Sequence, residues 1–232
     1  MEATMSPVHP LRSSSRTFLL TILALLLALG CAGLAEPVRA DVGREAALQA
    51  LDSTDPAKRR DAVASLGDEG TMADIDRLIE ALHDQDAGVR EVAETAVWKI
   101  WLRSDDPAVN ALMQEGMRDM AQNRLGAAVD AFTRVIEKQP DFAEGWNKRA
   151  TVYFLMGDFD QSLADCDETL KRNPNHFGAL AGCGAIYAQR DELEQALEYF
   201  ERALEVNPNM PGVEQALGLV RERLATAGRR ST

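Results

Sequence analysis

Residues 140–174 read PDFAEGWNKRATVYFLMGDFDQSLADCDETLKRNP, and this stretch decides the fold. It begins and ends on prolines, Pro140 and Pro174, and Pro208 follows at the same spacing of thirty-four residues. A proline ends a helix because it lacks the backbone N–H and restricts the residue before it. A constant period of this length predicts a stack of helical hairpins, each of which buries its apolar face against its neighbours.

The three units share columns of matching character at this spacing. Two columns hold small residues, which let the two helices of a hairpin approach closely. Two others hold mostly large apolar residues, four positions apart, as on one face of an amphipathic helix. The small columns are Gly116, Ala150 and Gly184, and Ala128, Ser162 and Ala196; the large columns are Phe132, Cys166 and Phe200, and Ile136, Leu170 and Leu204.

These columns resemble the tetratricopeptide repeat (TPR), in three units over residues 109–210. The resemblance implies an all-α fold, an α-solenoid of antiparallel helical hairpins in which the first helix of each hairpin lines a concave face. Residues 211–226 are apolar on one side and charged elsewhere, which predicts a capping helix, since terminal repeats need a polar outer face. Residues 227–232 are expected to form a disordered tail.

Residues 42–103 repeat at a different period. Asp55 and Arg59 recur thirty-one residues later as Asp86 and Arg90, and each aspartate is placed to cap a helix start. This segment resembles a short pair of HEAT-type repeats. Two such units are few for independent stability, so we expect them to pack on the TPR units. The residues expected at that junction are Trp98, Ile100, Trp101 and Leu102, some of them buried.

Residues 1–40 have the pattern of an export signal. Arg12 and Arg16 precede an apolar run, TFLLTILALLLALG, that is followed by small residues. Cleavage after Ala40 or Ala35, lipidation at Cys31, and retention of residues 18–35 as a membrane anchor remain open alternatives. All three place the repeats outside the cytoplasm, in the periplasm or cell envelope; a thylakoid lumen or secretion would suit the same signal.

Composition and motifs argue against several classes of function. The net charge of −12 opposes binding to a phosphate backbone, so we expect no nucleic-acid partner. Only three histidines occur, and His176 stands in a turn between units, where a local hydrogen bond is the simplest role. No paired-histidine motif, nucleophile elbow or phosphate-binding glycine loop is present. We therefore expect no enzymatic activity, no cofactor and no metal.

The resemblance assigns a set of residues to the concave face, where methionine and phenylalanine would make an adaptable apolar groove for a peptide or helix. The alternative is that the HEAT-like segment or another chain already covers this face. The residues expected to bind a partner are Asn110, Met113, Met117, Met120, Asn147, Thr151, Phe154 and Leu155, with Ala181, Ala185 and Ala188 in the third unit.

One subclass of the family binds the C-terminal carboxylates of chaperones through basic residues and asparagines on this face. That set is mostly absent here, because Gly178 and Gly182 replace the basic residues of the third unit. We expect a different ligand. Lys148 and Arg149 are expected to pair with neighbouring acidic side chains such as Glu144 or Asp165.

Cys166 and Cys183 lie in neighbouring helices of successive units, in columns that pack together. In an oxidising compartment they could form a disulfide, and otherwise they would be buried thiols that fill space. The sequence does not supply the Cα separation that decides between these alternatives.

These features predict a non-enzymatic protein–protein interaction scaffold of the cell envelope, which holds a peptide or helix of a partner protein in its concave TPR groove. The alternative is a structural subunit of a constitutive oligomer or membrane-associated complex, whose groove is permanently filled. The apolar run near the N-terminus could tether either one to a membrane.

Overall fold

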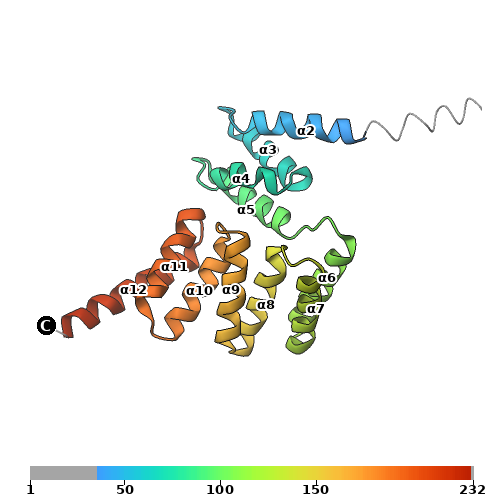
Figure 1. Ribbon diagram of the computed structural model, residues 1–232. Helices are drawn as coiled ribbons and strands as arrows, with labels where there is room; N and C mark the ends of the chain where they lie inside the picture. Colours follow the sequence, from blue (N-terminus) through green and yellow to red (C-terminus); the bar gives the residue numbers. More distant parts are fainter. Residues whose placement is uncertain (1–35, 231–232) are drawn as a thin grey trace, which may run out of the picture. The chain divides into compact units, whose positions relative to one another are not determined.

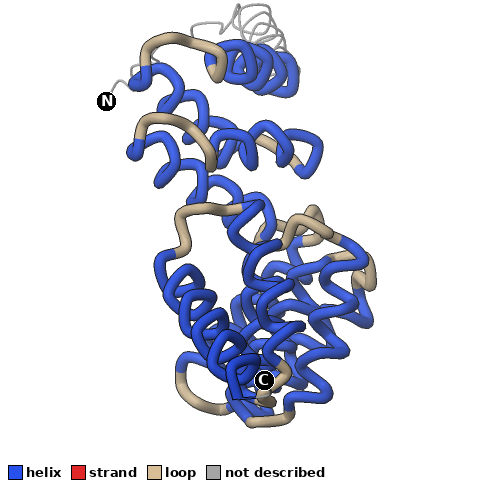
Figure 2. Tube along the Cα trace, turned by 90° about the vertical axis from the view of Figure 1, so that its left-hand side faces the viewer, coloured by secondary structure: helices blue, strands red, loops and turns tan. Residues whose placement is uncertain are grey.

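The computed structural model describes residues 36–230, and every regular element among them is a helix (Figures 1 and 2). The chain divides into two units, residues 1–45 and residues 46–232, and α2 (Glu36–Ala50) crosses the boundary between them. The predicted export signal, with Cys31 and the apolar run, lies outside the described residues up to position 35. Within residues 36–230, no helix combines the length and the apolar character that crossing a bilayer would need.

The second unit begins with a small helical layer, formed by α3 (Pro56–Glu69), the short 3-10 helix η1 (Met72–Asp74), α4 (Ile75–Ala81) and α5 (Ala87–Trp101). These helices bury one apolar cluster. Its fully enclosed members include Leu66, Leu78, Leu82, Val89 and Val97.

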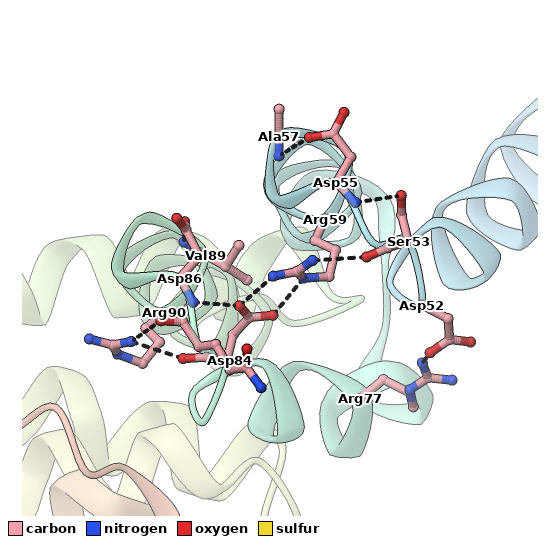
Figure 3. A network of polar contacts seen from close by, with 11 residues as sticks. Asp52, Ser53, Asp55, Ala57, Arg59, Arg77, Asp84, Asp86, Val89 and Arg90 are labelled. Atoms are coloured by element: carbon pink, nitrogen blue, oxygen red, sulfur yellow. Dashed lines mark hydrogen bonds and ion pairs between the residues drawn. The ribbon is translucent and has the colours of Figure 1, made fainter.

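The repeated Asp–Arg pattern holds the ends of these helices together (Figure 3). Asp55 accepts a hydrogen bond from the Ala57 N–H at the start of α3, and Asp86 accepts one from the Val89 N–H at the start of α5. Both caps were predicted and are confirmed. Arg59 donates to both carboxylate oxygens of Asp84 at 2.7 Å, so α3 is tied to the loop before α5.

Three antiparallel hairpins follow, as the sequence predicts (Figure 1). They consist of α6 (Pro107–Ala121) and α7 (Leu125–Lys138), α8 (Ala143–Met156) and α9 (Phe159–Arg172), and α10 (Phe177–Gln189) and α11 (Leu193–Val206). The final helix, α12 (Pro211–Arg230), covers the last hairpin with Leu217 and Val220. It is longer than predicted, because residues 227–230 continue the helix instead of starting a disordered tail.

The small residues in the repeated columns allow the two helices of each hairpin to pack closely, as predicted. A Cβ atom added at Gly116 would lie 2.6 Å from the Phe132 ring, and one added at Gly184 would lie 2.6 Å from the Phe200 ring. In the middle hairpin the Ser162 hydroxyl donates to the Ala150 carbonyl at 2.8 Å. Close packing of the two helices therefore requires a small residue at each of these positions.

The first helical layer packs directly on the hairpins. Trp98 and Trp101 of α5 contact Phe177 at the start of α10, with ring centroids 5.3 and 5.0 Å away. Farther along, Asn209 accepts from Arg90 and donates to the Leu82 carbonyl, each at 2.8 Å. The predicted burial of aromatic residues at this junction is confirmed, because Trp101 is only 3% exposed.

A candidate peptide-binding face on the second and third hairpins

A pocket of about 150 Å³ lies between the first helices of the second and third hairpins. Asn147, Thr151 and Phe154 of α8 form one wall, and Gly178, Gly182 and Ala185 of α10 form the other; Cys166 of α9 also lines it. The lining is mostly apolar, and its polar side chains are Asn147, Thr151 and Ser162. This combination suits a bound peptide, whose apolar side chain would enter the pocket while its polar backbone meets the polar groups.

The pocket exists because α10 presents glycine where other side chains would fill the space. A Cβ atom at Gly182 would meet only the Cys166 sulfur, at 3.9 Å, so that position has room for a larger residue. At Gly178 a Cβ would lie 2.8 Å from Trp98 of α5, so this glycine is needed for close packing. Gly182 therefore controls the volume of the pocket without bearing on the packing of the hairpins.

The predicted binding residues of the first hairpin lie elsewhere. Met113 is 1% exposed and belongs to the hairpin core, where the half-buried Met117 and Met120 also pack. Asn110 uses both ends of its amide on Ser104: its Nδ2 donates to the Ser104 carbonyl at 2.7 Å, and its Oδ1 accepts from the Ser104 N–H at 2.9 Å. Met113 is therefore too deeply buried to line an open groove, and the Asn110 amide is engaged by the linker before α6, whereas partner binding by the half-buried Met117 and Met120 stays a prediction.

The four predicted residues of the second hairpin lie at or beside the pocket. Asn147 donates from Nδ2 to Glu144 at 3.0 Å, and the Thr151 hydroxyl donates to the Asn147 carbonyl at 2.9 Å. The half-buried Phe154 ring contacts Phe159, with centroids 5.7 Å apart. Leu155, by contrast, is 55% exposed. Partner binding by these residues stays a prediction.

A buried polar cluster adjoins the pocket through Asn147. Glu144 is fully enclosed; its Oε1 lies 2.7 Å from Nε2 of His176, and its Oε2 accepts from Asn147. Nδ1 of His176 accepts from the Ala179 N–H at 3.0 Å, which caps α10 and confirms the local role expected for this histidine. Because Nδ1 accepts, Nε2 carries the proton that is donated to Glu144.

The electrostatics of this cluster favour the Glu144 carboxylate. Burial alone would raise the pKa of Glu144, but its contacts with His176, Lys148 and Asn147 outweigh burial and lower that pKa to about 2. The Lys148 Nζ lies 3.5 Å from the carboxylate and 5.1 Å from the centre of the Trp98 ring. Trp101 stacks on His176 at 4.4 Å. The cluster thus ties α5 to both helices that wall the pocket.

The sequence reasoning missed this cluster as a unit, although it named each residue separately. Glu144 and His176 are thirty-two residues apart, close to the repeat period, and that spacing was the available signal. The expected pairing of the basic residues is confirmed: Lys148 lies beside Glu144, and Arg149 donates to both oxygens of Asp165 at 2.7 and 2.9 Å. Both cations are engaged within the protein.

Cys166 and Cys183 are buried next to each other as free thiols, so the disulfide considered from the sequence is not formed in this structure. The hydrogen bond with the Cys166 thiol and burial raise the pKa of Cys183. Both effects disfavour the thiolate, which is the reactive form of cysteine. Oxidation of this pair stays a prediction. Over residues 36–230, no group of three or more His, Cys, Asp or Glu side chains could hold a metal ion.

Comparisons with known proteins agree with this architecture. Two family models of the tetratricopeptide repeat match residues 113–167 and 141–209. A TPR repeat-containing protein of Rhizobium etli is 34% identical over 125 residues, which cover 54% of this chain and 61% of that protein. The small glutamine-rich tetratricopeptide repeat-containing protein 2 of Mycosarcoma maydis is 25% identical, over 53% of this chain and 36% of its own length. The chain therefore spans less than two thirds of these curated relatives.

Solved structures of tetratricopeptide-repeat domains also resemble this chain. The first TPR of Spaghetti (RPAP3), bound to the HSP90 peptide SRMEEVD, matches with a TM-score of 0.51 and 26% identity, over 52% of this chain and 96% of that one. The Sgt2 TPR domain from Aspergillus fumigatus matches with a TM-score of 0.51 and 21% identity, over 53% of this chain and 83% of that one. This chain therefore has an all-α helical-repeat fold, and residues 113–209 contain tetratricopeptide repeats.

Proposed function

We propose that this protein is a non-enzymatic adaptor that binds a peptide or helix of a partner protein through the pocket between α8 and α10. The observation that carries the proposal is the cavity opened by Gly182 and walled by Asn147, Thr151 and Phe154. A large apolar side chain of the partner would fill this cavity, and the Thr151 side would face the polar backbone of the bound segment.

The related repeats of RPAP3 support a peptide as the ligand, since that structure holds one. The charge of this chain argues against an acidic ligand of that type. Its net charge is −12, and the two cations of α8, Lys148 and Arg149, already face Glu144 and Asp165. We propose that the partner segment is neutral or basic and is anchored by an apolar residue.

We also propose that the protein is exported and that residues 42–103 form HEAT-like repeats. Export to the periplasm or cell envelope rests on the charged and apolar pattern of residues 1–40. The HEAT-like assignment rests on α3 and α5, which begin with capping aspartates thirty-one residues apart and carry Arg59 and Arg90 at matching positions. This segment would serve as a rigid support that fixes the start of α10 through Trp98 and Trp101.

Filling the pocket from within tests the proposed site. Gly182→Leu places a side chain in the cavity and improves helix propensity, so the protein stays folded while a partner's side chain is excluded. Gly218→Leu in α12 is the matched control, because a Cβ at Gly218 meets nothing within 4 Å. We expect Gly182→Leu to weaken co-purification of the partner with the tagged full-length chain at least tenfold, and Gly218→Leu to leave it unchanged.

Equal co-purification by both variants would contradict the proposed site. Size measurement of the purified protein separates the adaptor from the permanently filled subunit. A free adaptor is monomeric, whereas a stable homo-oligomer that persists in both variants would favour the structural alternative.

A further inference from the structure

The pocket between α8 and α10 adjoins an aromatic residue of α5 at one end. Gly178 lines the pocket, and a Cβ atom added at Gly178 would lie 2.8 Å from the Trp98 indole. Trp98 is half-buried, so part of its side chain is accessible, and the Lys148 Nζ of α8 lies 5.1 Å from its ring centre. The surface of the proposed binding face therefore continues from the pocket onto α5.

One side of α5 faces the hairpins, and Glu94 lies in the middle of that side. Arg90 donates to Asn209 at 2.8 Å, and Trp98 contacts Phe177, so these two residues of α5 mark the side that packs on the repeats. Residues four positions apart in a helix share a face. Glu94 is four residues from Arg90 and four from Trp98, which places it between these two contacts.

The Glu94 carboxylate has no partner within residues 36–230. Its side chain is half-buried, yet no hydrogen bond or ion pair joins it to another described group, and its oxygens remain open to solvent. By contrast, the half-buried carboxylates of Asp84 and Glu168 each face an arginine of the protein. A carboxylate that is partly removed from water gains from a cation beside it. The surface next to Trp98 is therefore suited to a positive charge supplied by a partner.

Arginine is the side chain that fits Trp98 and Glu94 together. Its planar guanidinium stacks on aromatic rings and donates two parallel hydrogen bonds to a carboxylate. Lys148 also lies at the Trp98 ring, but its charge is matched by Glu144. The net charge of −12 attracts a basic segment over longer distances as well.

We infer that the partner segment carries an arginine that lies against Trp98 and pairs with Glu94, while an apolar residue of the same segment fills the pocket beside Gly182. This inference rests on the proposed function and specifies the chemistry of the partner. Gly182 is one helical turn from Gly178, and Glu94 is one turn from Trp98, so the two anchor points are on the order of 12–15 Å apart. An extended segment spans that distance in about four residues.

A series of defined peptides tests both the charge and the spacing. Each peptide carries one leucine and one arginine, separated by none to six glycine or serine residues, and an uncharged dye. Matched peptides carry citrulline, which keeps the shape of arginine but removes its charge. Binding to the full-length chain is measured by fluorescence anisotropy. We expect the tightest binding, with a Kd of about 1 mM or tighter, when leucine and arginine are about four positions apart, and about tenfold weaker binding of the citrulline peptide.

Two variants of the protein assign this effect to Glu94. Glu94→Gln keeps the size of the side chain and removes its charge, so we expect it to weaken binding of the arginine peptide about tenfold and to leave the citrulline peptide unchanged. The control Glu205→Gln removes an exposed carboxylate of α11 and should change neither.

Equal binding of the arginine and citrulline peptides, or no binding by any peptide of the series at 1 mM, overturns the inference. Gly182→Leu tests the proposed function separately. Peptide binding that survives Gly182→Leu counts against the pocket between α8 and α10. Peptide binding that is lost in Gly182→Leu but unaffected by Glu94→Gln counts against the arginine site alone.

Discussion

The buried Glu144–His176 pair gives the sharpest prediction for stability. Glu144→Ala leaves the Nε2–H of His176 and the Nδ2 group of Asn147 without their acceptor, inside a site closed by Trp101. Each buried polar group left without its partner costs about 1–3 kcal/mol, so we expect Glu144→Ala to lower the free energy of unfolding by about 2–5 kcal/mol. Glu144→Gln keeps the volume and one acceptor oxygen, so we expect it to cost less, about 1–2 kcal/mol.

Urea unfolding followed by circular dichroism at pH 7 measures these differences. The control is Glu115→Ala, which removes a half-exposed carboxylate that lies 3.6 Å from Arg134. An exposed ion pair of that kind contributes about 0–1 kcal/mol. The reasoning is refuted if the midpoint of Glu144→Ala matches that of Glu115→Ala, because the cluster would then contribute no more than a surface contact.

The same pair predicts a dependence of stability on pH. The folded-state pKa of Glu144 is about 2 and its ordinary value is 4.5, so its contribution is complete above about pH 4.5 and is lost as the pH falls towards 2. The difference corresponds to about 3 kcal/mol. Comparing wild type with Glu144→Gln cancels the titration of all other carboxylates. We expect the stability advantage of wild type to shrink between pH 5 and pH 3; a constant advantage across this window would refute the assignment.

Three further predictions concern local features. Gly157 ends α8 with a φ of 78°, so we expect Gly157→Ala to lower the free energy of unfolding by about 1 kcal/mol. The control Gly126→Ala, in α7, should not lower it, and thermal unfolding of both variants measures the difference. Asp86→Ala removes the cap of α5 and should cost about 1 kcal/mol in urea unfolding; no change would mean that the hydrogen bond to Val89 is not stabilising. In a Cys31→Ser background, Cys166 and Cys183 should react with a thiol reagent only after denaturation, and immediate reaction of the native protein would contradict their burial.

The hairpins could be predicted from the sequence because the contacts that hold their helices together recur at a fixed spacing. A small residue at Gly116 or Gly184 faces an aromatic ring in the second helix of its own hairpin, and this relation repeats at a fixed spacing. The caps at Asp55 and Asp86 could be predicted for a similar reason, since a cap depends on a few neighbouring residues.

The binding face could be predicted only in part. Met113 and Phe154 both lie in first helices and both are apolar, and periodicity alone does not say which apolar residue is covered by other elements. Packing in the first hairpin buries Met113, whereas Gly182 leaves open space beside Phe154. The Glu144 cluster depends on the docking of α5 on α10, a tertiary contact that no local pattern encodes.

The central claim, that a partner occupies the face formed by α8 and α10, is tested most directly by site-specific photo-crosslinking in cells. One probe replaces Leu155, which is exposed next to Phe154, and a control probe replaces Leu219, which is equally exposed on α12. We predict one dominant crosslinked protein from position 155 that is absent from position 219 and is lost when Gly182→Leu is added. Identical crosslinked products from both positions, or crosslinking at 155 that survives Gly182→Leu, would contradict the claim.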